Sequence, residues 1–181
     1  VIGCWVYRFD PASGDIDVVA TDVQRPNGIA FSPDESRLYV ADMSVVDFPT
    51  KGRRRLVAYD VAEGRRLTDP SVLAVIEPGI PDGFTVDASG NIYCSFEQGI
   101  MVLAADGRRL GVIPVPERVS NCTFGGPDQD ELFITATVNR GQGSEVTVTR
   151  STDHKCGRCW RLLPEVTEDG ALCNRCDEVV A

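Results

Sequence analysis

The sequence predicts an all-β chain in two parts: a partial β-propeller over residues 1–140 and a small cysteine-rich module over residues 151–181. Residues 141–150 begin with glycine and polar side chains and are predicted to be the junction. Three observations support this division. Short apolar segments alternate with turn residues in the first part, a related segment recurs within it, and four of the seven cysteines gather in the second.

The strands of the first part are predicted from short segments rich in Val, Ile, Tyr and Phe, which often alternate apolar with polar side chains. Residue pairs suited to tight hairpin turns separate some of them, at Ser13-Gly14, Glu63-Gly64 and Asp106-Gly107. No window has the period of an amphipathic helix. The predicted strands are VYRFD, DIDVVA, SRLYVAD, RLVAYDV, SVLAVI, NIYCSF, IMVLAA, RLGVIPV and ELFITAT.

A repeated segment indicates how these strands are grouped. A segment that leads through a turn to another strand occurs three times. It begins with Pro26-Asn27-Gly28, then with Pro81-Asp82-Gly83, and a third time with Ser120-Asn121-Cys122. The successive offsets are 55 and 39 residues, and a four-stranded unit that recurs about every 40–50 residues is typical of a propeller blade. An unrelated β-sandwich with similar hairpins is the alternative.

Residues 1 to 138 supply about three such blades, whereas closed propellers have about four to eight. We therefore expect either a fragment of a larger propeller or several copies that associate to complete a ring. Open sheet edges remain in a fragment, and exposed strand edges favour self-association.

Composition excludes several classes of function. The formal net charge of −9 argues against a general nucleic-acid binder, which needs a basic surface. No stretch reaches the ~18 apolar residues that span a bilayer, so a membrane protein is excluded, and no secretory signal is found. The single histidine, His154, leaves little room for histidine-based catalysis. The odd number of cysteines suits a reducing compartment, and we expect a cytoplasmic location.

Asn27 and Asp82 are the candidate ligand-binding residues of the first part. They occupy the same place in successive repeats, each between a proline and a glycine, and we expect them at the central channel of the propeller. An amide oxygen and a carboxylate converging there suit a hard divalent cation such as Ca²⁺, Mg²⁺ or Mn²⁺. The alternative is that both are turn residues whose side chains cap their own backbone.

Residues 4–137 resemble the C-terminal half of the SMP-30/gluconolactonase family, also called the regucalcin-like lactonases. The resemblance implies a six-bladed propeller that hydrolyses sugar lactones with one divalent metal on its axis. It also implies that Asn27 and Asp82 are metal ligands and that Asp82 is the catalytic general base. The matching segments are VYRFDPASGDIDVVATDVQRPNGIAFSPDESRLYVAD, IPDGFTVDASGNIYCS, GIMVLAADGRRLGVIPVPE and SNCTFGGPDQDELFITAT.

The chain also departs from this family. The family's first-blade metal-ligand Glu, in an E-G-P-x-W context, has no counterpart here, and the substrate-contacting Arg and Asn of the earlier blades are absent. With two of three protein ligands and an open ring, we expect little or no lactonase activity from this chain alone.

The cysteine-rich module contains two C-x-x-C pairs, Cys156 with Cys159 and Cys173 with Cys176. Two such turns facing each other provide four thiolates in a tetrahedron, which is a structural Zn²⁺ site with no open position for catalysis. Metal binding would provide the folding free energy of so short a segment. The alternatives are a redox-active dithiol or two disulfides.

Residues 145–181 resemble the C-terminal zinc finger of bacterial isoleucyl-tRNA synthetases, in the segments KCGRCWRLLPEV and LCNRC. The resemblance implies the same four cysteine ligands and a weak tRNA contact, since residues 151–181 hold only four basic residues against six acidic ones. The possible RNA contacts are Lys155, Arg158, Trp160, Arg161 and Arg175.

Three hypotheses follow for the whole chain. The first, which we favour, is a fragment of a lactonase-type propeller joined to a structural zinc finger. The second is a zinc-dependent tRNA-binding tail of an isoleucyl-tRNA synthetase, although the catalytic HIGH and KMSKS motifs are absent. The third is a non-catalytic scaffold in which the partial propeller is an interaction surface.

Overall fold

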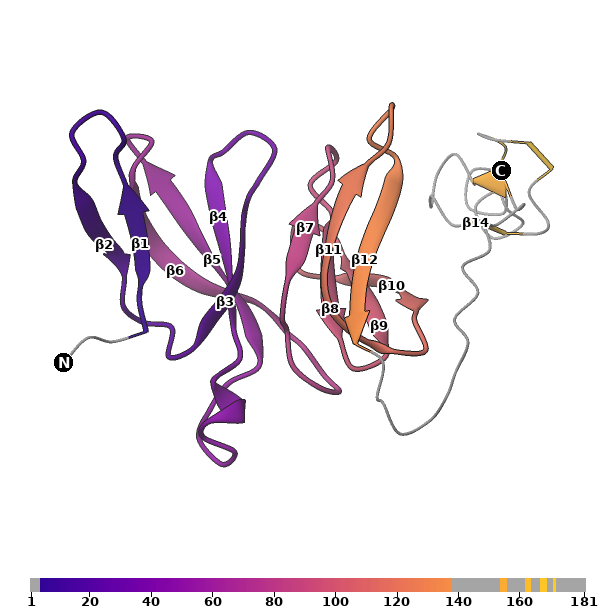
Figure 1. Cartoon of the computed structure of the whole chain (residues 1–181), viewed down its shortest axis with the longest axis horizontal. Coiled ribbons are helices and arrows are strands. Elements are labelled where there is room, and N and C mark those ends of the chain that lie inside the picture. Colours follow the sequence, from indigo (N-terminus) through magenta and orange to yellow (C-terminus); the bar gives the residue numbers. More distant parts are fainter. Residues whose placement is uncertain (1–3, 138–153, 156–161, 164–166, 169–170, 172–181) are drawn as a thin grey trace. The chain divides into compact units, whose positions relative to one another are not determined.

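The structure, a computed structural model, describes residues 4–137, 154–155, 162–163, 167–168 and 171 (Figure 1). The chain separates into two compact units, Val1–Gly141 and Gln142–Ala181. The described residues form strands and one short 3₁₀ turn, η1 (Ser44–Val46), which confirms the all-β prediction. No helix in this part of the chain is long and apolar enough to cross a membrane.

The first unit consists of four antiparallel sheets. Two have four strands, in the orders β3-β4-β5-β6 and β7-β8-β9-β10, and two have two strands, β1-β2 and β11-β12. In the second unit, β13 (His154–Lys155) pairs with β14 (Leu162–Leu163). The bounds in the first unit are β1 Val6–Phe9, β2 Ile16–Ala20, β3 Pro26–Phe31, β4 Arg37–Asp42, β5 Arg55–Ala62, β6 Arg66–Val75, β7 Phe84–Val86, β8 Ile92–Phe96, β9 Gly99–Leu103, β10 Arg109–Pro114, β11 Arg118–Gly125 and β12 Glu131–Thr137.

The predicted hairpin turns are confirmed by their backbone angles. Gly14, between β1 and β2, has φ 80°, and Gly107, between β9 and β10, has φ 86°. Between β5 and β6 both Glu63 and Gly64 have positive φ, 55° and 67°, as a tight hairpin with a primed turn requires. These turns make each strand pair with its neighbour in the chain, so the sheets are simple meanders.

Three strands that the sequence pattern did not single out are the innermost ones, β3, β7 and β11. They coincide with the heads of the three repeats, where Pro and Gly lower the local preference for strand. Residues of β3 contact β7, and residues of β7 contact β11, so the first strand of each sheet lies beside the first strand of the next.

Consecutive sheets pack face to face through apolar side chains. Leu56 and Tyr39 of the first four-stranded sheet share a buried core with Ile92 and Met101 of the second. On its other face, the second sheet packs against β11-β12, where the rings of Tyr93 and Phe124 meet edge to face with centroids 4.9 Å apart.

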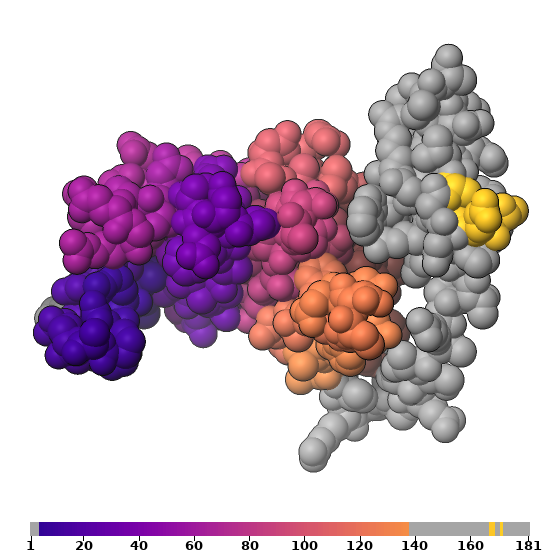
Figure 2. Space-filling view, turned by 90° about the horizontal axis from the view of Figure 1, so that it is seen from above, coloured from indigo at the N-terminus to yellow at the C-terminus, as the bar shows by residue number. Residues whose placement is uncertain are grey.

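The hairpin β1-β2 covers the remaining face of the first four-stranded sheet, where Val6 and Ala20 pack on Leu38 and Val40. Figure 2 shows the sheets following one another in chain order, from the indigo hairpin to the orange one. This arrangement is propeller-like, and the sheets of the described residues do not close into a ring.

The core between the two four-stranded sheets predicts a measurable stability difference. Leu56 is fully buried there, so Leu56→Ala leaves a cavity and is expected to lower the free energy of unfolding by about 2–5 kcal/mol. Leu110→Ala is the matched control, because Leu110 is 44% exposed and the change is expected to cost less than about 0.5 kcal/mol. Urea denaturation followed by circular dichroism measures both, and equal losses would contradict the packing described.

Candidate functional site

Three polar side chains occupy equivalent positions in the three repeats, in or beside the innermost strands. Asn27 lies in β3, Asp82 lies just before β7, and Asn121 lies in β11. The side-chain amide of Asn27 donates a hydrogen bond of 2.6 Å from Nδ2 to Oδ1 of Asp82. The first two repeats therefore meet through the same position of their pattern.

Backbone hydrogen bonds join the same strands across neighbouring sheets. The Gly28 N–H donates to the carbonyl oxygen of Asp82 at 3.2 Å. One repeat later, the Gly83 N–H donates to the carbonyl oxygen of Ser120 at 2.8 Å. The innermost strands are thus connected in sequence, β3 to β7 and β7 to β11.

The two glycines permit this close approach because they have no Cβ. A Cβ at Gly28 would lie 2.5 Å from the carbonyl oxygen of Asp82 and 2.6 Å from the ring of Phe84. A Cβ at Gly83 would overlap the side chain of Asn121. Glycine after Asn27 and Asp82 is therefore a packing requirement of the site.

A buried ion pair supports the other side of Asn27. Asn27 Nδ2 also lies 2.8 Å from the Sδ atom of Met43, which directly follows the fully buried Asp42. The Asp42 carboxylate accepts hydrogen bonds from Nε of Arg55 at 3.3 Å and from the Ser44 N–H at 3.2 Å. Because a buried carboxylate needs such partners, this pairing holds the segment that carries Met43 in place.

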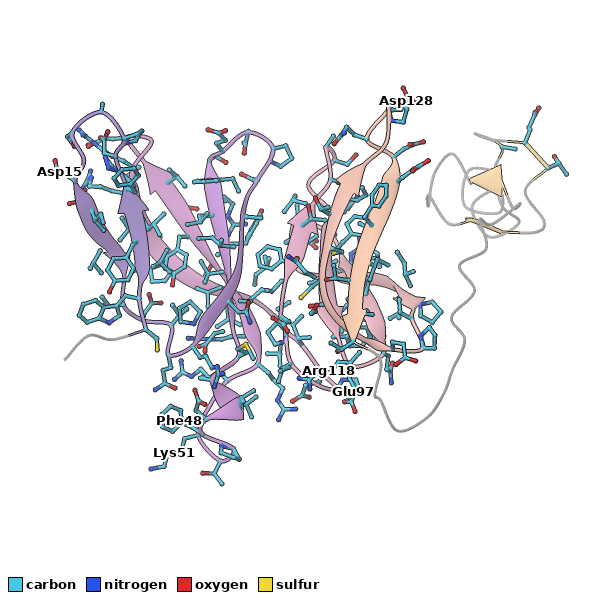
Figure 3. All side chains as sticks on the ribbon, in the orientation of Figure 1. Asp15, Phe48, Lys51, Glu97, Arg118 and Asp128 are labelled. Carbon is cyan, nitrogen blue, oxygen red and sulfur yellow. The ribbon has the colours of Figure 1, made fainter. Side chains whose placement is uncertain are left out.

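A pocket of about 430 Å³ opens beside Asp82. Glu97, Glu117 and Arg118 contribute charged groups to its lining together with Asp82. Glu97 and Arg118 lie at the same end of the unit as Phe48 and Lys51, and Asp15 and Asp128 lie at the opposite end (Figure 3). The apolar part of the lining is Ile80, Phe96, Pro116 and Val119.

The thiol and hydroxyl groups near Asn27 and Asp82 have structural roles. Burial raises the pKa of the Cys122 thiol to about 11, and burial also raises the pKa of the Cys94 thiol strongly. Both thiols are therefore protonated at neutral pH. The Ser95 hydroxyl is buried and donates to the carbonyl oxygen of Gly83 at 2.8 Å, which stabilises the strand that follows Asp82.

The chemistry of the donors fits a hard divalent cation. Asn27, Asp82 and Asn121 offer amide and carboxylate oxygens, which Ca²⁺, Mg²⁺ and Mn²⁺ prefer. Within the described ranges no group of three or more His, Cys, Asp or Glu side chains gathers as a metal site. A cation at this place would therefore depend on the asparagine oxygens beside a single carboxylate.

The structure brings the two residues singled out from the sequence into contact, and their role as ligands stays a prediction. The hydrogen bonds found for the Asn27 side chain go to Asp82 and Met43, not to its own backbone, so the turn-capping alternative does not describe Asn27. Asn121 was not singled out. Its signal was its alignment with Asn27 and Asp82 in the third repeat, where Ser and Cys replace the flanking Pro and Gly.

Most residues predicted for the second part of the chain lie outside the described residues. Lys155 belongs to β13, and its side chain is not described. Outside the described ranges lie the predicted zinc ligands Cys156, Cys159, Cys173 and Cys176 and the predicted RNA contacts Arg158, Trp160, Arg161 and Arg175.

The fold and the site together define a propeller-like all-β protein with a candidate ligand site where its innermost strands begin. The chain belongs to the family described as the SMP-30/Gluconolactonase/LRE-like region, whose model matches residues 4–138. This match confirms the family resemblance noted for the first part of the sequence.

Individual relatives agree with this membership. The chain is 35% identical over 164 residues to the pentonolactonase XacC of Haloferax volcanii, covering 87% of this chain and 53% of that protein. In three dimensions it resembles XC5397 of Xanthomonas campestris, a gluconolactonase, with a TM-score of 0.64 and 38% identity over 73% of this chain and 41% of that one. The chain thus spans about half the length of these relatives.

A separate and shorter similarity concerns another protein. Over 55 residues the chain is 56% identical to the isoleucine–tRNA ligase of Zymomonas mobilis, which is 29% of this chain and 6% of that enzyme. The similarity agrees with the resemblance noted for residues 145–181, and it leaves the zinc site itself a prediction.

The contact between innermost strands predicts the effect of a single methyl group. Gly28→Ala is expected to lower the free energy of unfolding by about 1–3 kcal/mol, because the added Cβ would force β3 away from Asp82. Gly111→Ala is the control: a Cβ there meets no atom within 4 Å, so a change below about 0.5 kcal/mol is expected. Chemical denaturation measures the free energy of unfolding of both variants. A Gly28→Ala variant as stable as the control would contradict the strand contact.

Proposed function

We propose that residues 4–138 carry part of the axial divalent-cation site of a sugar-lactone hydrolase. The observation that carries this proposal is the convergence of Asn27 and Asp82, joined by a 2.6 Å hydrogen bond beside a pocket of about 430 Å³. Family membership and the similarity to a pentonolactonase and a gluconolactonase support lactones as the substrate class.

Asp82 is the proposed general base. Asp82 lines the pocket, and a water molecule held beside its carboxylate would transfer a proton to it while attacking an ester carbonyl. Asn27 orients this carboxylate by donating a hydrogen bond to one of its oxygens. Asn27 and Asp82, with Asn121 as a further oxygen donor, would hold the cation, which polarises the lactone carbonyl when it is bound.

The pocket is suited to a small polyhydroxylated ligand. Its volume falls within the range of about 300–1,000 Å³ that small-molecule sites occupy. Glu97 and Glu117 can accept hydrogen bonds from sugar hydroxyls, and Arg118 can donate to ring or carbonyl oxygens.

We expect the site of this chain to be a weak catalyst by itself. Ca²⁺ takes about six to eight oxygen ligands, and the described heads of the innermost strands offer three side chains. We propose that the sheets correspond to about three blades of a six-bladed propeller. A non-catalytic interaction scaffold is the alternative function, and it predicts neither cation binding nor lactone hydrolysis.

The role of Asp82 in cation binding can be measured directly. Asp82→Asn removes the only carboxylate of the three donors, and we expect it to weaken Ca²⁺ or Mn²⁺ binding by at least about tenfold in calorimetric titration, which corresponds to about 1.4 kcal/mol. Any hydrolysis of glucono-δ-lactone, followed by acid release, is expected to be lost in the same variant.

Asp106→Asn is the matched control. Asp106 is an exposed turn residue whose carboxylate accepts the Arg108 N–H, and asparagine can make the same bond. This variant should bind the cation as the unchanged chain does. Equal binding by the Asp82 and Asp106 variants would refute the proposed site.

We further propose that Cys156, Cys159, Cys173 and Cys176 hold one structural zinc ion. The two C-x-x-C pairs and the similarity to an isoleucine–tRNA ligase support this proposal. A weak tRNA contact by this module also remains a proposal, as does a cytoplasmic location for the chain.

The zinc proposal predicts the metal content of the purified chain. About one zinc per chain is expected by elemental mass spectrometry after dialysis, and Cys156→Ser or Cys173→Ser should lose it. Cys4→Ser is the control, since Cys4 is exposed in the first unit and should be dispensable for zinc. A metal-free chain whose mass shows two disulfides would overturn the proposal.

A further inference from the structure

The side-chain amide of Asn27 has two neighbours that can only accept hydrogen bonds. Its Nδ2 atom donates to Oδ1 of Asp82 and also contacts the Sδ atom of Met43. An ionised carboxylate has no hydrogen to donate, and a thioether sulfur is a weak acceptor that also has none. If the amide were turned over, its own oxygen would lie against these two acceptors. The two neighbours therefore determine which way the Asn27 amide faces.

This orientation decides which oxygens remain for a ligand. Both hydrogens of Asn27 Nδ2 are used, one on Asp82 and one on Met43. Among the described residues, no hydrogen bond is found for Oδ1 of Asn27 or for Oδ2 of Asp82. The pair therefore offers one amide oxygen and one carboxylate oxygen, which are donors that hard divalent cations prefer.

The equivalent asparagine of the third repeat behaves differently. Oδ1 of Asn121 accepts a hydrogen bond of 2.9 Å from the N–H of the next residue, Cys122. That local bond engages the same oxygen that Asn27 leaves open. The contact with the sulfur of Met43 thus distinguishes Asn27 from Asn121.

The backbone brings Met43 to Asn27. Strand β3 has a β-bulge at Asn27, because its pairing with β4 shifts register between Pro26 and Ile29. A bulge bends its strand and changes the direction of a side chain. Next to the bulge, the Met43 N–H donates to the carbonyl oxygen of Arg25 at 3.1 Å. The bulge and this bond together place the Asn27 side chain beside Met43.

A buried carboxylate holds both segments of this contact. Oδ1 of the fully buried Asp42 accepts the N–H of Arg25 at 3.4 Å and the N–H of Ser44 at 3.2 Å. One donor lies two residues before Asn27, and the other directly follows Met43. Movement of either segment would leave a buried charge short of partners, which is costly. The Met43 side chain is itself buried, so it has little freedom to leave Asn27.

We propose that Met43 is a positioning residue of the candidate site. Its sulfur accepts the second amide hydrogen of Asn27, so that the Asn27 oxygen is directed, with the open oxygen of Asp82, to the place of a bound cation. This inference rests on the proposed cation site and adds to it a residue that offers no oxygen. The terminal torsion of asparagine is soft. Without the sulfur contact the amide is less ordered, and binding a cation then has to order it.

Met43→Leu tests the proposal in the full chain. Leucine keeps the apolar volume and removes the acceptor, so binding of Ca²⁺ or Mn²⁺ in calorimetric titration is expected to weaken by about threefold or more. Met101→Leu is the matched control. Met101 is the other methionine of the chain, and it is buried in the core between the two four-stranded sheets, so the change should leave the cation affinity as it is.

A third variant separates hydrogen bonding from packing. Met43→Gln keeps a side chain of similar length and supplies an amide oxygen as acceptor. If Met43 orients Asn27, the glutamine variant should bind the cation more tightly than the leucine variant. If Met43 only fills space, the order is reversed, because leucine suits a buried position better than glutamine. The reversed order would overturn the proposal.

A measurement without any cation makes this test independent of the proposed function. The NMR order parameter of the Asn27 side-chain amide, identified by its absence in Asn27→Ala, is expected to fall in Met43→Leu, to recover in Met43→Gln and to stay unchanged in Met101→Leu. If the unchanged chain binds no cation and the order parameter still falls, the cation site fails and the positioning role stands. An order parameter that is the same in Met43→Leu overturns the proposal, and so does an unchanged affinity in a chain that binds the cation.

Discussion

The close approach of the innermost strands is the constraint on which the site depends. The Gly28 N–H donates to the carbonyl oxygen of Asp82 and the Gly83 N–H donates to that of Ser120, and there is no room at either glycine for a side chain. This contact brings Asn27 against Asp82, and it aligns β3, β7 and β11 so that the heads of three sheets face one another. The chemistry of the site therefore follows from backbone packing.

Buried hydrogen bonds support this contact on both of its sides. On the β3 side, the buried carboxylate of Asp42 is satisfied by Arg55 and Ser44, so the chain that carries Met43 cannot shift without leaving a buried charge unpaired. On the β7 side, the buried Ser95 hydroxyl fixes the carbonyl of Gly83. A preorganised pair of polar side chains is the result, beside a pocket with three further charged groups.

Membership of the SMP-30/Gluconolactonase/LRE-like family explains why these features occur together, and the incomplete sheets set this chain apart from a closed ring. Apolar side chains such as Phe31 and Phe133 are exposed on faces that elsewhere in the unit are buried between sheets. Because burial of apolar area is the main favourable term in association, these faces are where the unit is least complete.

The sequence by itself determined the all-β class, most strands, the hairpin turns and the equivalence of Asn27 with Asp82, because alternation, positive-φ glycines and repeat spacing are written in neighbouring residues. Tertiary structure alone decided that β3, β7 and β11 are strands, that the Asn121 side chain packs against Gly83, and that Glu97 and Arg118 line a pocket with Asp82. Those outcomes depend on which sheet face meets which, a non-local choice set by packing and by glycines that allow close contact, and no local pattern encodes it.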